Sequence, residues 1–293
     1  MRILHLDSGR EMRGGQWQVL RLHEGLLERG HESFLLARRG SPLLAATQEQ
    51  KLPCDVLKPL RVASISRSHD LVHAHDARSH TLGAVIARGP LVVSRRVAFP
   101  VRDSAMSRCK YRRADLFLAV SRYVAGQLLK AGVERDRVTV VYDGVRLPPE
   151  AAHGIAILTP FTLDPLKGMA LAKEAAQLAG VEITPTDNLD RDLPHARSLV
   201  YLSRSEGLGS GILLGMAHGV TVIASRIGGI PELIEDGMNG ILVDNTPEAV
   251  AGALRRIDPA IGAAGRETVA QRFTEARMID ATLDAYSRVL SHQ

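Results

Sequence analysis

The stretch that decides the fold is SRSEGLGSGILLGMAHGVTVIASRIGGIPELIEDGMNGILV, residues 203–243. It predicts a strand end, a glycine-rich turn, a helix, an apolar strand, a second glycine turn and a short helix. Gly207, Gly209 and Gly211 let backbone amides approach a ligand closely, and the following helix presents its positive dipole end to the same place. The carboxylate of Glu206 lies at the mouth of this turn. Two glycine turns around a buried strand indicate a site for an anionic, hydroxyl-rich molecule such as a sugar diphosphate.

Working outward from this stretch, apolar runs alternate with amphipathic segments of helical length. This alternation predicts parallel strands joined by crossover helices. Such sheets bind ligands at the carboxyl ends of their strands. The strands predicted in the first half are Ile3–Leu6, Leu71–His75, Leu91–Ser94, Leu116–Val120 and Val138–Val141. Those in the second half are Ile155–Leu158, Val181–Thr184, Leu199–Leu202, Val220–Ala224 and Ile241–Val243. The predicted helices are Gln16–Arg29, Ser79–Arg88, Arg122–Ala131, Met169–Ala179, Glu248–Arg256 and Glu267–Leu290.

The best linker candidate is the stretch Asp143–Gly154, in which Pro148 and Pro149 block regular structure. We therefore expect one domain over residues 1–148 and a second over residues 149–293. A chain of 293 residues that is 45% hydrophobic is long enough to form two cores of ordinary size.

Composition limits the classes of function. Aromatic residues make up only 4% of the chain, which offers few stacking platforms for single-stranded nucleic acid. The formal charge of +5 permits attraction to anionic substrates or membrane surfaces. No apolar run approaches the length of a membrane span and no signal peptide opens the sequence, so we expect a cytoplasmic protein. The two cysteines, Cys54 and Cys109, form no disulfide framework, and no residues recur at metal-ligand spacing, so we expect no metal ion.

This arrangement of motifs resembles glycosyltransferase family 4, and the resemblance covers nearly the whole chain. Residues 2–33 resemble the first strand, glycine loop and helix of that family, and residues 70–76 (DLVHAHD) resemble a strand-end motif of its acceptor domain. Residues 116–133 and 138–145 resemble the last unit before the crossing to the second domain, and residues 203–243 resemble the nucleotide-sugar half. The resemblance implies the GT-B fold: two Rossmann-like domains whose parallel sheets face a central cleft, the second domain shortened here by about one strand–helix unit. It also implies that the last helix packs back on the first domain.

The resemblance assigns the donor site. Lys167, before Gly168, stands where the family binds phosphate, and Glu206 stands beside the donor sugar. Backbone amides of the turn after Glu206 would hold sugar and phosphate, and the glycine pair of the first loop would approach the diphosphate: Gly207, Leu208, Gly209, Ser210, Gly211, Gly14 and Gly15. The alternatives are a helix-capping carboxylate, a solvated lysine and a plain turn before a helix.

Two positions depart from the family pattern. The family has a second glutamate eight residues after the first, which holds the ribose, and this chain has Leu214 there. The family has an arginine five residues before the lysine, and this chain has Thr162. If each charged hydrogen bond contributes about 1.5–3 kcal/mol, these replacements weaken nucleotide-sugar binding.

On the acceptor side, the resemblance points to the ends of two strands of the first domain. We expect His75, with Asp76, to act at the end of one strand, and Arg95 and Arg96 to bind a phosphate or an acidic acceptor at the end of the next. A structural histidine and a solvated arginine pair are the alternatives. A run of basic residues could face a membrane surface or an anionic acceptor, and the alternative is an ordinary solvated surface. The run consists of Arg102, Arg108, Lys110, Arg112 and Arg113.

The predicted function is therefore retaining, metal-independent transfer of a sugar from a nucleotide-diphosphate sugar to an acceptor hydroxyl in cell-envelope glycan or glycolipid synthesis. Glu206, Lys167 and His75 are the predicted catalytic residues. The nucleotide sugar is a co-substrate, no other cofactor is expected, and the acceptor is a sugar or a lipid-linked sugar, with contact to a membrane surface and none to nucleic acid. The main alternative is a catalytically weak or inactive binding or scaffold subunit, which Leu214, Thr162 and the missing strand–helix unit favour. A more distant alternative is an epimerase that acts on nucleotide sugars.

Overall fold

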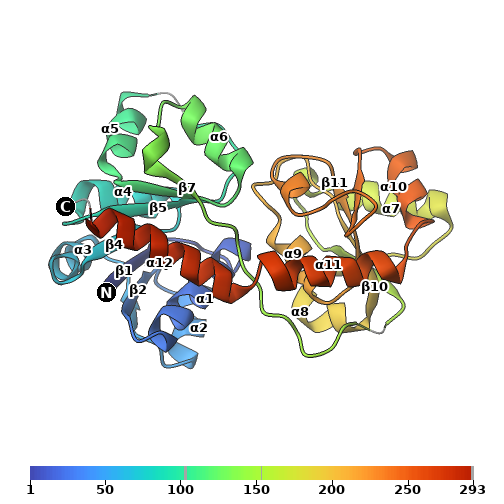
Figure 1. Cartoon of the computed structure of the whole chain (residues 1–293), viewed down its shortest axis with the longest axis horizontal. Helices are drawn as coiled ribbons and strands as arrows, with labels where there is room; N and C mark the ends of the chain where they lie inside the picture. The colour runs from blue at the N-terminus through green and yellow to red at the C-terminus, as the bar shows by residue number, and fades with distance from the viewer. Residues whose placement is uncertain (102–103, 153, 292–293) are drawn as a thin grey trace. The chain divides into compact units, whose positions relative to one another are not determined.

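A computed structural model describes residues 1–101, 104–152 and 154–291 of the chain (Figure 1). These residues form two compact units. The first comprises Met1–Asp143 together with the last helix, α12 (Glu275–Ser291), and the second comprises Gly144–Thr274. Each unit is a parallel sheet covered by helices, which confirms the predicted α/β class and the two Rossmann-like domains.

The first unit contains a sheet of seven strands in the order β3-β2-β1-β4-β5-β6-β7, and every neighbouring pair is parallel. The strand order reverses between β1 and β4, which defines a topological switch point. The strands are β1 (Arg2–Asp7), β2 (Glu32–Ala37), β3 (Cys54–Val56), β4 (Leu71–Ala74), β5 (Leu91–Arg95), β6 (Leu116–Ala119) and β7 (Val138–Val140). Strands β2 and β3 are additions to the predicted set.

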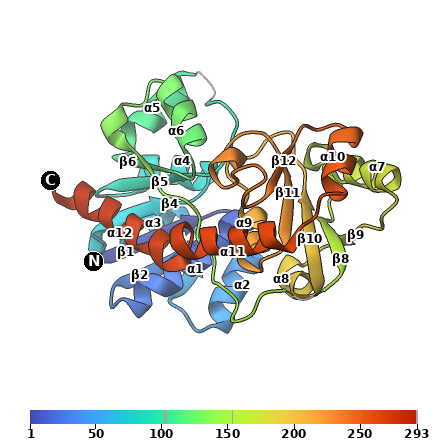
Figure 2. The ribbon, with the colours of Figure 1, turned by 45° about the vertical axis from the view of Figure 1, so that its right-hand side comes forward.

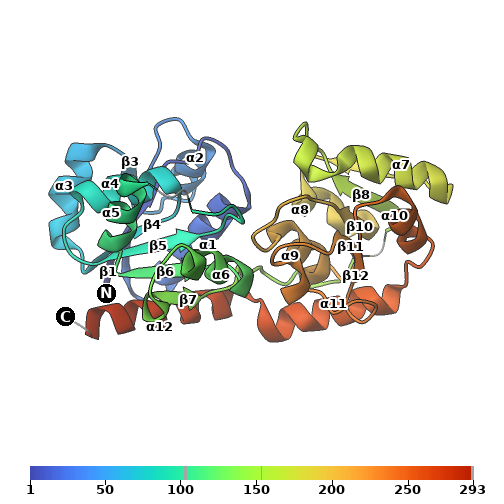
Figure 3. The same cartoon turned by 90° about the horizontal axis from the view of Figure 1, so that it is seen from above.

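Helices cover both faces of this sheet, which explains why its strands are continuous apolar runs. Figure 3 shows α12 along one side of the sheet and α3, α4 and α5 on the other. On the α12 side, Ile3, Leu71 and Val92 pack with Ile279 and Tyr286. The other helices of the unit are α1 (Gly14–Glu28), α2 (Pro42–Glu49), α3 (Pro59–Ile65), α4 (Ala77–Ile86), α5 (Ala105–Arg113) and α6 (Arg122–Lys130).

The second unit contains a five-stranded parallel sheet in the order β12-β11-β10-β8-β9, so its switch point lies between β8 and β10. Figure 2 shows α7 and α10 on one side of this sheet and α9 and α11 on the other. The strands are β8 (Ala156–Pro160), β9 (Thr184–Thr186), β10 (Ala196–Tyr201), β11 (Thr221–Ser225) and β12 (Ile241–Val243). The helices are α7 (Met169–Ala179), α8 (Leu189–Asp192), α9 (Ser210–Ala217), α10 (Pro247–Leu254) and α11 (Pro259–Arg272).

Two predicted boundaries in this unit are wrong. The strand expected over Val181–Thr184 is β9, which begins at Thr184, because Val181 still hydrogen-bonds back to Ala176 of α7 and packs against the core beneath it. The helix expected over Glu267–Leu290 is interrupted after α11. The carbonyl of Phe273 there accepts from the N–H of Val145 instead of continuing a helix.

The glycine turns after β10 and β11 contact each other through the backbone. The N–H of Gly229 donates to the carbonyl of Glu206 over 3.3 Å. Gly228 has φ of +55°, and a Cβ atom on it would lie 2.0 Å from the same carbonyl oxygen. Only glycine fits this position, since an L side chain meets both the left-handed backbone and the clash.

We therefore expect Gly228→Ala to destabilise the second unit by more than the backbone conformation alone explains. Gly237→Ala is the matched control, because Gly237 has φ of +77° and nothing within 4 Å of its Cβ position. The left-handed backbone costs about 1–2 kcal/mol in both variants, and the clash adds about 1–3 kcal/mol at Gly228 alone. Urea unfolding followed by circular dichroism measures both, and equal losses would contradict the contact.

A second prediction concerns His80 on α4, which is 2% exposed and whose Nε2 lies 3.2 Å from the carbonyl oxygen of Lys110 on α5. Burial, followed by the charge of Lys110, lowers the pKa of His80 from 6.5 to about 3. The unfolded chain therefore binds one proton more than the folded chain between these values. The resulting stability is present above pH 6.5 and is lost as the pH falls, by about 1.4 kcal/mol per pH unit.

His80→Gln should therefore reduce the slope of the free energy of unfolding against pH between about pH 6 and about pH 4. The expected reduction is about 1.4 kcal/mol per pH unit, which corresponds to one proton. Trp17 is the only tryptophan and lies in the first unit, so its fluorescence during urea unfolding reports on this unit. His195→Gln is the control, because His195 is exposed in the second unit. A slope that is unchanged in His80→Gln counts against the buried neutral imidazole.

Candidate functional site

The candidate donor site lies at the switch point of the second sheet. Strands β8 and β10 are neighbours there, and the loops that follow them contain Lys167 and Glu206. Because both strands run in the same direction, their carboxyl ends meet at one edge of the sheet. Parallel pairing therefore brings together two residues that are 39 positions apart in the sequence.

The loop after β8 is built to hold Lys167. The side chain of Asp164 accepts from the N–H of Leu166, and Gly168 adopts the left-handed conformation with φ of +64°. A Cβ atom on Gly168 would lie 2.5 Å from the Cβ of Leu202, so this glycine lets the loop pack directly on the end of β10. The N–H of Arg204 donates to the carbonyl of Leu166 and closes the loop against the same strand end.

Lys167 and Glu206 form an ion pair. The Nζ of Lys167 lies 2.7 Å from Oε2 of Glu206, and the two side chains are 37% and 16% exposed. The hydroxyl of Tyr201 donates to the same Oε2 over 3.2 Å. Burial and, second, the neighbouring carboxylate raise the pKa of Tyr201 well above its ordinary value, so it stays a hydrogen-bond donor. The site thus presents a partly exposed cation beside a carboxylate that is held from two sides.

Helix α9 begins next to this pair. Gly209 is its N-cap, with φ of +104°, and the eight residues Ser210–Ala217 follow. The first N–H groups of a helix have no partner within the helix and point out of its positive end. Gly207, Leu208, Ser210 and Gly211 surround this end, and the side chain of Leu208 is buried, so the turn offers its backbone rather than its side chains.

Three polar residues that the sequence analysis missed brace these loops. The N–H of Ser203 donates to Oγ of Ser225, whose hydroxyl donates to Oδ1 of Asn245, and the amide of Asn245 donates to the carbonyl of Ser203. They lie at the carboxyl ends of β10, β11 and β12. Small polar residues directly after predicted strands were the available signal, but their contacts depend on the order of the strands.

The structure shows where the two residues that depart from the family pattern, Thr162 and Leu214, lie. The Oγ1 of Thr162 accepts from the N–H of Asp164, so this side chain supports the turn that leads to Lys167. Leu214 is half-buried on α9.

In the first unit, the glycine pair begins α1. Gly14 is the first residue of the helix, and a Cβ atom on Gly15 would lie 3.4 Å from Cδ of Arg96, so this glycine allows the arginine to pass close to the loop. The side chain of Gln16 donates to the carboxylate of Asp7 at the end of β1. Burial, followed by the charge of Asp76, raises the pKa of Asp7.

The two predicted arginines have partners. Arg96 forms an ion pair with Asp143 over 2.6 Å; its side chain is 19% exposed, and that of Asp143 only 4%. Arg95 donates to the hydroxyl of Tyr111 and to the carbonyl of Phe99. Arg96 thus lies beside the glycine loop with its side chain mostly buried.

Asp76 serves as the N-cap of α4. Its carboxylate accepts from the N–H of Arg78 and from the N–H and hydroxyl groups of both Ser79 and Ser8. Burial acts to raise the pKa of Asp76, but the bonds from Ser79 and Ser8 prevail and lower it. This carboxylate joins the loops after β1 and β4.

His75 is 6% exposed, and its Nε2 lies 2.9 Å from Nδ1 of His5. His73, two residues earlier, lies on the same face of β4, and it pairs with His5 of β1. The sequence has no metal-ligand spacing, but strand pairing brings these histidines together. His5, His73 and His75 each offer a nitrogen atom within 4.8 Å of the others.

The basic run lies on α5, except for Arg102, which is outside the described residues. Lys110 donates to the carbonyl of Ala77, and Arg113 donates to the carbonyl of Gly89. Two members of the run therefore fasten α5 to neighbouring segments. Among the helices in the described ranges, none combines the length and the apolar character needed to cross a membrane.

The chain matches the sequence profiles of two glycosyltransferase families. Residues 12–147 match "Glycosyltransferase Family 4", and residues 164–257 match "Glycosyl transferases group 1". The chain is 36% identical over 121 residues to alpha-maltose-1-phosphate synthase of Mycolicibacterium smegmatis, a match that covers 37% of this chain and 31% of that protein. It is 25% identical to D-inositol 3-phosphate glycosyltransferase of Acidothermus cellulolyticus, covering 77% of this chain and 68% of the relative. The matched part is thus about a third of the first relative's length and about two thirds of the second's.

Solved structures share the fold over the whole chain. Anabaena Alr3699/HepE, in complex with UDP and glucose, superimposes with a TM-score of 0.85 at 18% identity, covering 98% of this chain and 99% of that one. Sucrose-phosphate synthase from Thermosynechococcus elongatus gives a TM-score of 0.78 at 16% identity, covering 100% of both chains. With the two profile matches in the expected order along the sequence, the chain belongs to the family 4, group 1 glycosyltransferases and has their GT-B fold.

Proposed function

We propose that this chain transfers a sugar from a nucleotide-diphosphate sugar to an acceptor hydroxyl, with retention at the anomeric carbon and without a metal ion at the diphosphate. The observation that most supports this proposal is the ion pair between Lys167 and Glu206, which lies at the switch point of the second sheet beside the start of α9. A diphosphate needs cations and N–H donors, and a sugar needs a fixed hydrogen-bond acceptor. The two residues and the helix end supply these groups together.

Uridine is the base we propose for the donor. Anabaena Alr3699/HepE was solved with UDP and with UDP-glucose, and it shares the fold of this chain. Because its sequence identity is only 18%, this likeness supports the choice of ligand for testing rather than a particular sugar.

Diphosphate binding requires Lys167 to change partners. A partly exposed ion pair contributes about 0–1 kcal/mol, whereas a charged hydrogen bond contributes about 1.5–3 kcal/mol. The exchange of the Glu206 carboxylate for a phosphate is therefore favourable for Lys167. It also frees Glu206, still held by Tyr201, to accept from a sugar hydroxyl.

The chemistry then requires stabilisation of the leaving diphosphate. Lys167 and the amides at the start of α9 place positive charge where negative charge develops as the glycosidic bond to phosphate breaks. The family mechanism lets the leaving phosphate take the proton of the acceptor hydroxyl on the same face, which gives retention without an enzyme nucleophile. Gly207–Gly211 act in this proposal through their backbones.

On the acceptor side, we propose that Arg96, beside Gly14 and Gly15, contacts an acidic or phosphorylated acceptor. Asp76 and His75 act in this proposal as positioning residues, since both are engaged beneath the loops that would touch the acceptor. Arg95 holds the segment after β5 through Phe99. The cytoplasm and the surface of its membrane remain the predicted place of action, with a glycan or glycolipid of the cell envelope as product.

A binding or scaffold subunit without activity is the second candidate, and Leu214 favours it because the ribose loses a carboxylate partner. Both candidates predict donor binding, and only the enzyme predicts transfer. Release of UDP that depends on an added acceptor, measured with UDP-glucose and a panel of phosphorylated sugars and glycolipids, separates the two. Tight binding with no transfer to any acceptor would favour the subunit.

We predict different effects on UDP binding from replacing the two members of the ion pair. Lys167→Ala should weaken UDP binding about 10- to 150-fold, which corresponds to about 1.5–3 kcal/mol for a charged hydrogen bond. Glu206→Gln should leave UDP binding unchanged or tighter, because it removes a carboxylate next to the phosphates, while it lowers the rate of sugar transfer. Calorimetry with UDP and transfer assays with UDP-glucose give the two quantities.

Lys173→Ala is the matched control, since Lys173 is an exposed lysine on α7 of the same unit. It should bind UDP like the parent. If Lys167→Ala and Lys173→Ala bind UDP equally well, the donor site has been assigned to the wrong loop.

Leu214→Glu tests the position of the ribose. If the ribose lies against α9 as in the family, a carboxylate at this half-buried position should tighten UDP binding about tenfold, by one added charged hydrogen bond. Leu214→Gln separates the charge from the change of shape. Weaker binding in both variants, with the fold intact by circular dichroism, would show that the nucleoside is oriented differently.

A further inference from the structure

Four histidines form a buried cluster on the α12 side of the first sheet. His5 is on β1, His23 on α1, and His73 and His75 are on β4 or directly after it. None is more than 6% exposed. The ring of His5 lies 5.9 Å from that of His23, 5.7 Å from that of His73 and 5.1 Å from that of His75, measured between centroids. This polar group interrupts an otherwise apolar layer.

The cluster leaves ring nitrogens without partners. Nδ1 of His5 pairs with Nε2 of His75, and Nδ1 of His23 lies 2.6 Å from Oγ of Ser33. Within the described part of the chain, the opposite nitrogens of His5 and His75 have no hydrogen-bond partner, although each is buried. Buried polar atoms are nearly always paired, so two orphans in one cluster need an explanation.

Three of the rings converge at the distances of a metal site. His5, His73 and His75 each contribute a nitrogen within 4.8 Å of the others. A tetrahedral ion with bonds of about 2.0–2.1 Å holds its nitrogen ligands roughly 3.4 Å apart, so small side-chain shifts suffice. Sheet pairing accounts for the convergence, because His5 lies opposite His73 and His75 follows on the same face.

The surroundings suit imidazole ligands. All three rings are buried, and the most exposed of them, His75, is only 6% exposed, so a bound ion would be shielded from water. The nearby positive charge of Arg96 opposes a bound cation, but Asp143 pairs with it over 2.6 Å.

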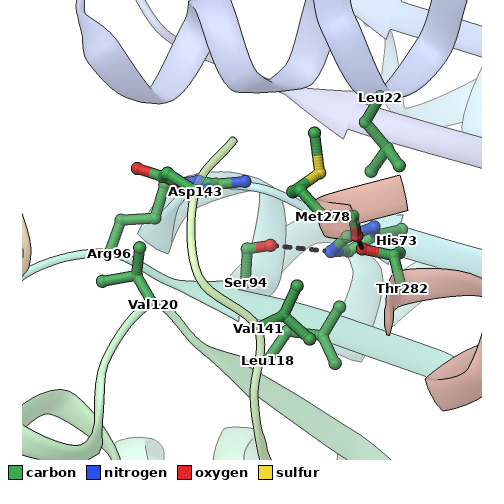
Figure 4. A pocket seen from close by; sticks show the side chains of 10 residues that line it. All are labelled: Leu22, His73, Ser94, Arg96, Leu118, Val120, Val141, Asp143, Met278 and Thr282. Carbon is green, nitrogen blue, oxygen red and sulfur yellow. Dashed lines mark hydrogen bonds and ion pairs between the residues drawn. The ribbon is translucent and has the colours of Figure 1, made fainter. Parts of the chain in front are cut away.

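Two hydroxyl groups contact His73. His73 lies 2.5 Å from the hydroxyl of Tyr286 on α12 and 2.8 Å from that of Ser94 on β5. One of these partners can orient the ring while the other nitrogen turns to the ion. Figure 4 shows His73 and Ser94 on the wall of a neighbouring cavity of about 10 Å³, which His5 and His75 do not line.

We propose that His5, His73 and His75 bind one divalent transition ion, with Zn²⁺ as the ion to test, as a structural site of the first unit. Imidazole ligands suit zinc, copper and nickel among the first-row ions. The ion would join the ends of β1 and β4, the two strands whose loops meet at Asp76. The three histidines belong to the first unit, whereas Lys167 and Glu206 belong to the second, and the proposed ion is structural and takes no part in the sugar transfer.

The test is the metal content of the full-length chain without an affinity tag, produced in zinc-supplemented medium so that the ion can enter during folding. After desalting and brief EDTA treatment, mass spectrometry of the metal should find about one zinc per chain. His5→Gln and His75→Gln should each lower the zinc retained at least about tenfold. His80→Gln, which changes a buried histidine of the same unit outside the cluster, should retain zinc like the parent.

X-ray absorption of the zinc in the parent keeps the test decisive if a cluster variant fails to fold. About three imidazole nitrogens around the ion support the site, and ligation by oxygen or by fewer nitrogens overturns it. A parent with no retained zinc, or His5→Gln and His75→Gln chains that retain as much zinc as the parent, would also overturn the proposal. Loss of zinc from His80→Gln to the same degree would show an adventitious ion only.

Discussion

Parallel pairing of strands that are distant in the sequence is the constraint on which both candidate sites depend. In each unit, the strand order reverses once, and at that point two loops leave the same edge of the sheet in opposite directions. The loops after β8 and β10 bring Lys167 to Glu206, and the loops after β1 and β4 bring Ser8 to Asp76. Neither pair would form without the register of the sheet beneath it.

The two switch points use the same construction with different chemistry. In the second unit, the strand ends carry a charged pair that is partly exposed, so the charges remain available to a ligand. In the first unit, the strands carry buried neutral imidazoles, and the carboxylate above them, Asp76, is saturated with hydrogen bonds. A partly exposed ion pair contributes little stability and can exchange partners at low cost, whereas a saturated buried carboxylate cannot. The second switch point is therefore suited to binding and the first to holding loops in place.

Much of the fold could be predicted because buried parallel strands are continuous apolar runs. The long runs that became β1, β4, β5, β6, β10 and β11 were readable for this reason. Strand β3 is only three half-buried residues, too short to show a period, and β2, with its largely buried run, was not predicted. Helix α2 was missed although Ser41 and Pro42 form a recognisable start signal, with the hydroxyl of Ser41 accepting from the N–H of Leu44.

For the candidate donor site, single residues could be predicted from the sequence, but the contacts between them could not. Lys167 and Glu206 could be proposed one at a time, because each follows a strand and precedes a glycine. Their ion pair could not, nor could the contacts of Tyr201, Ser225 and Asn245, because all of these depend on which strands are neighbours. The histidine cluster is the extreme case: local spacing connects His73 with His75, but only strand and helix packing brings His5 and His23 to them. Polar residues inside predicted buried strands are thus the feature that sequence reasoning should pursue: a histidine in an apolar run must find a partner across the sheet, and the strand order decides which one.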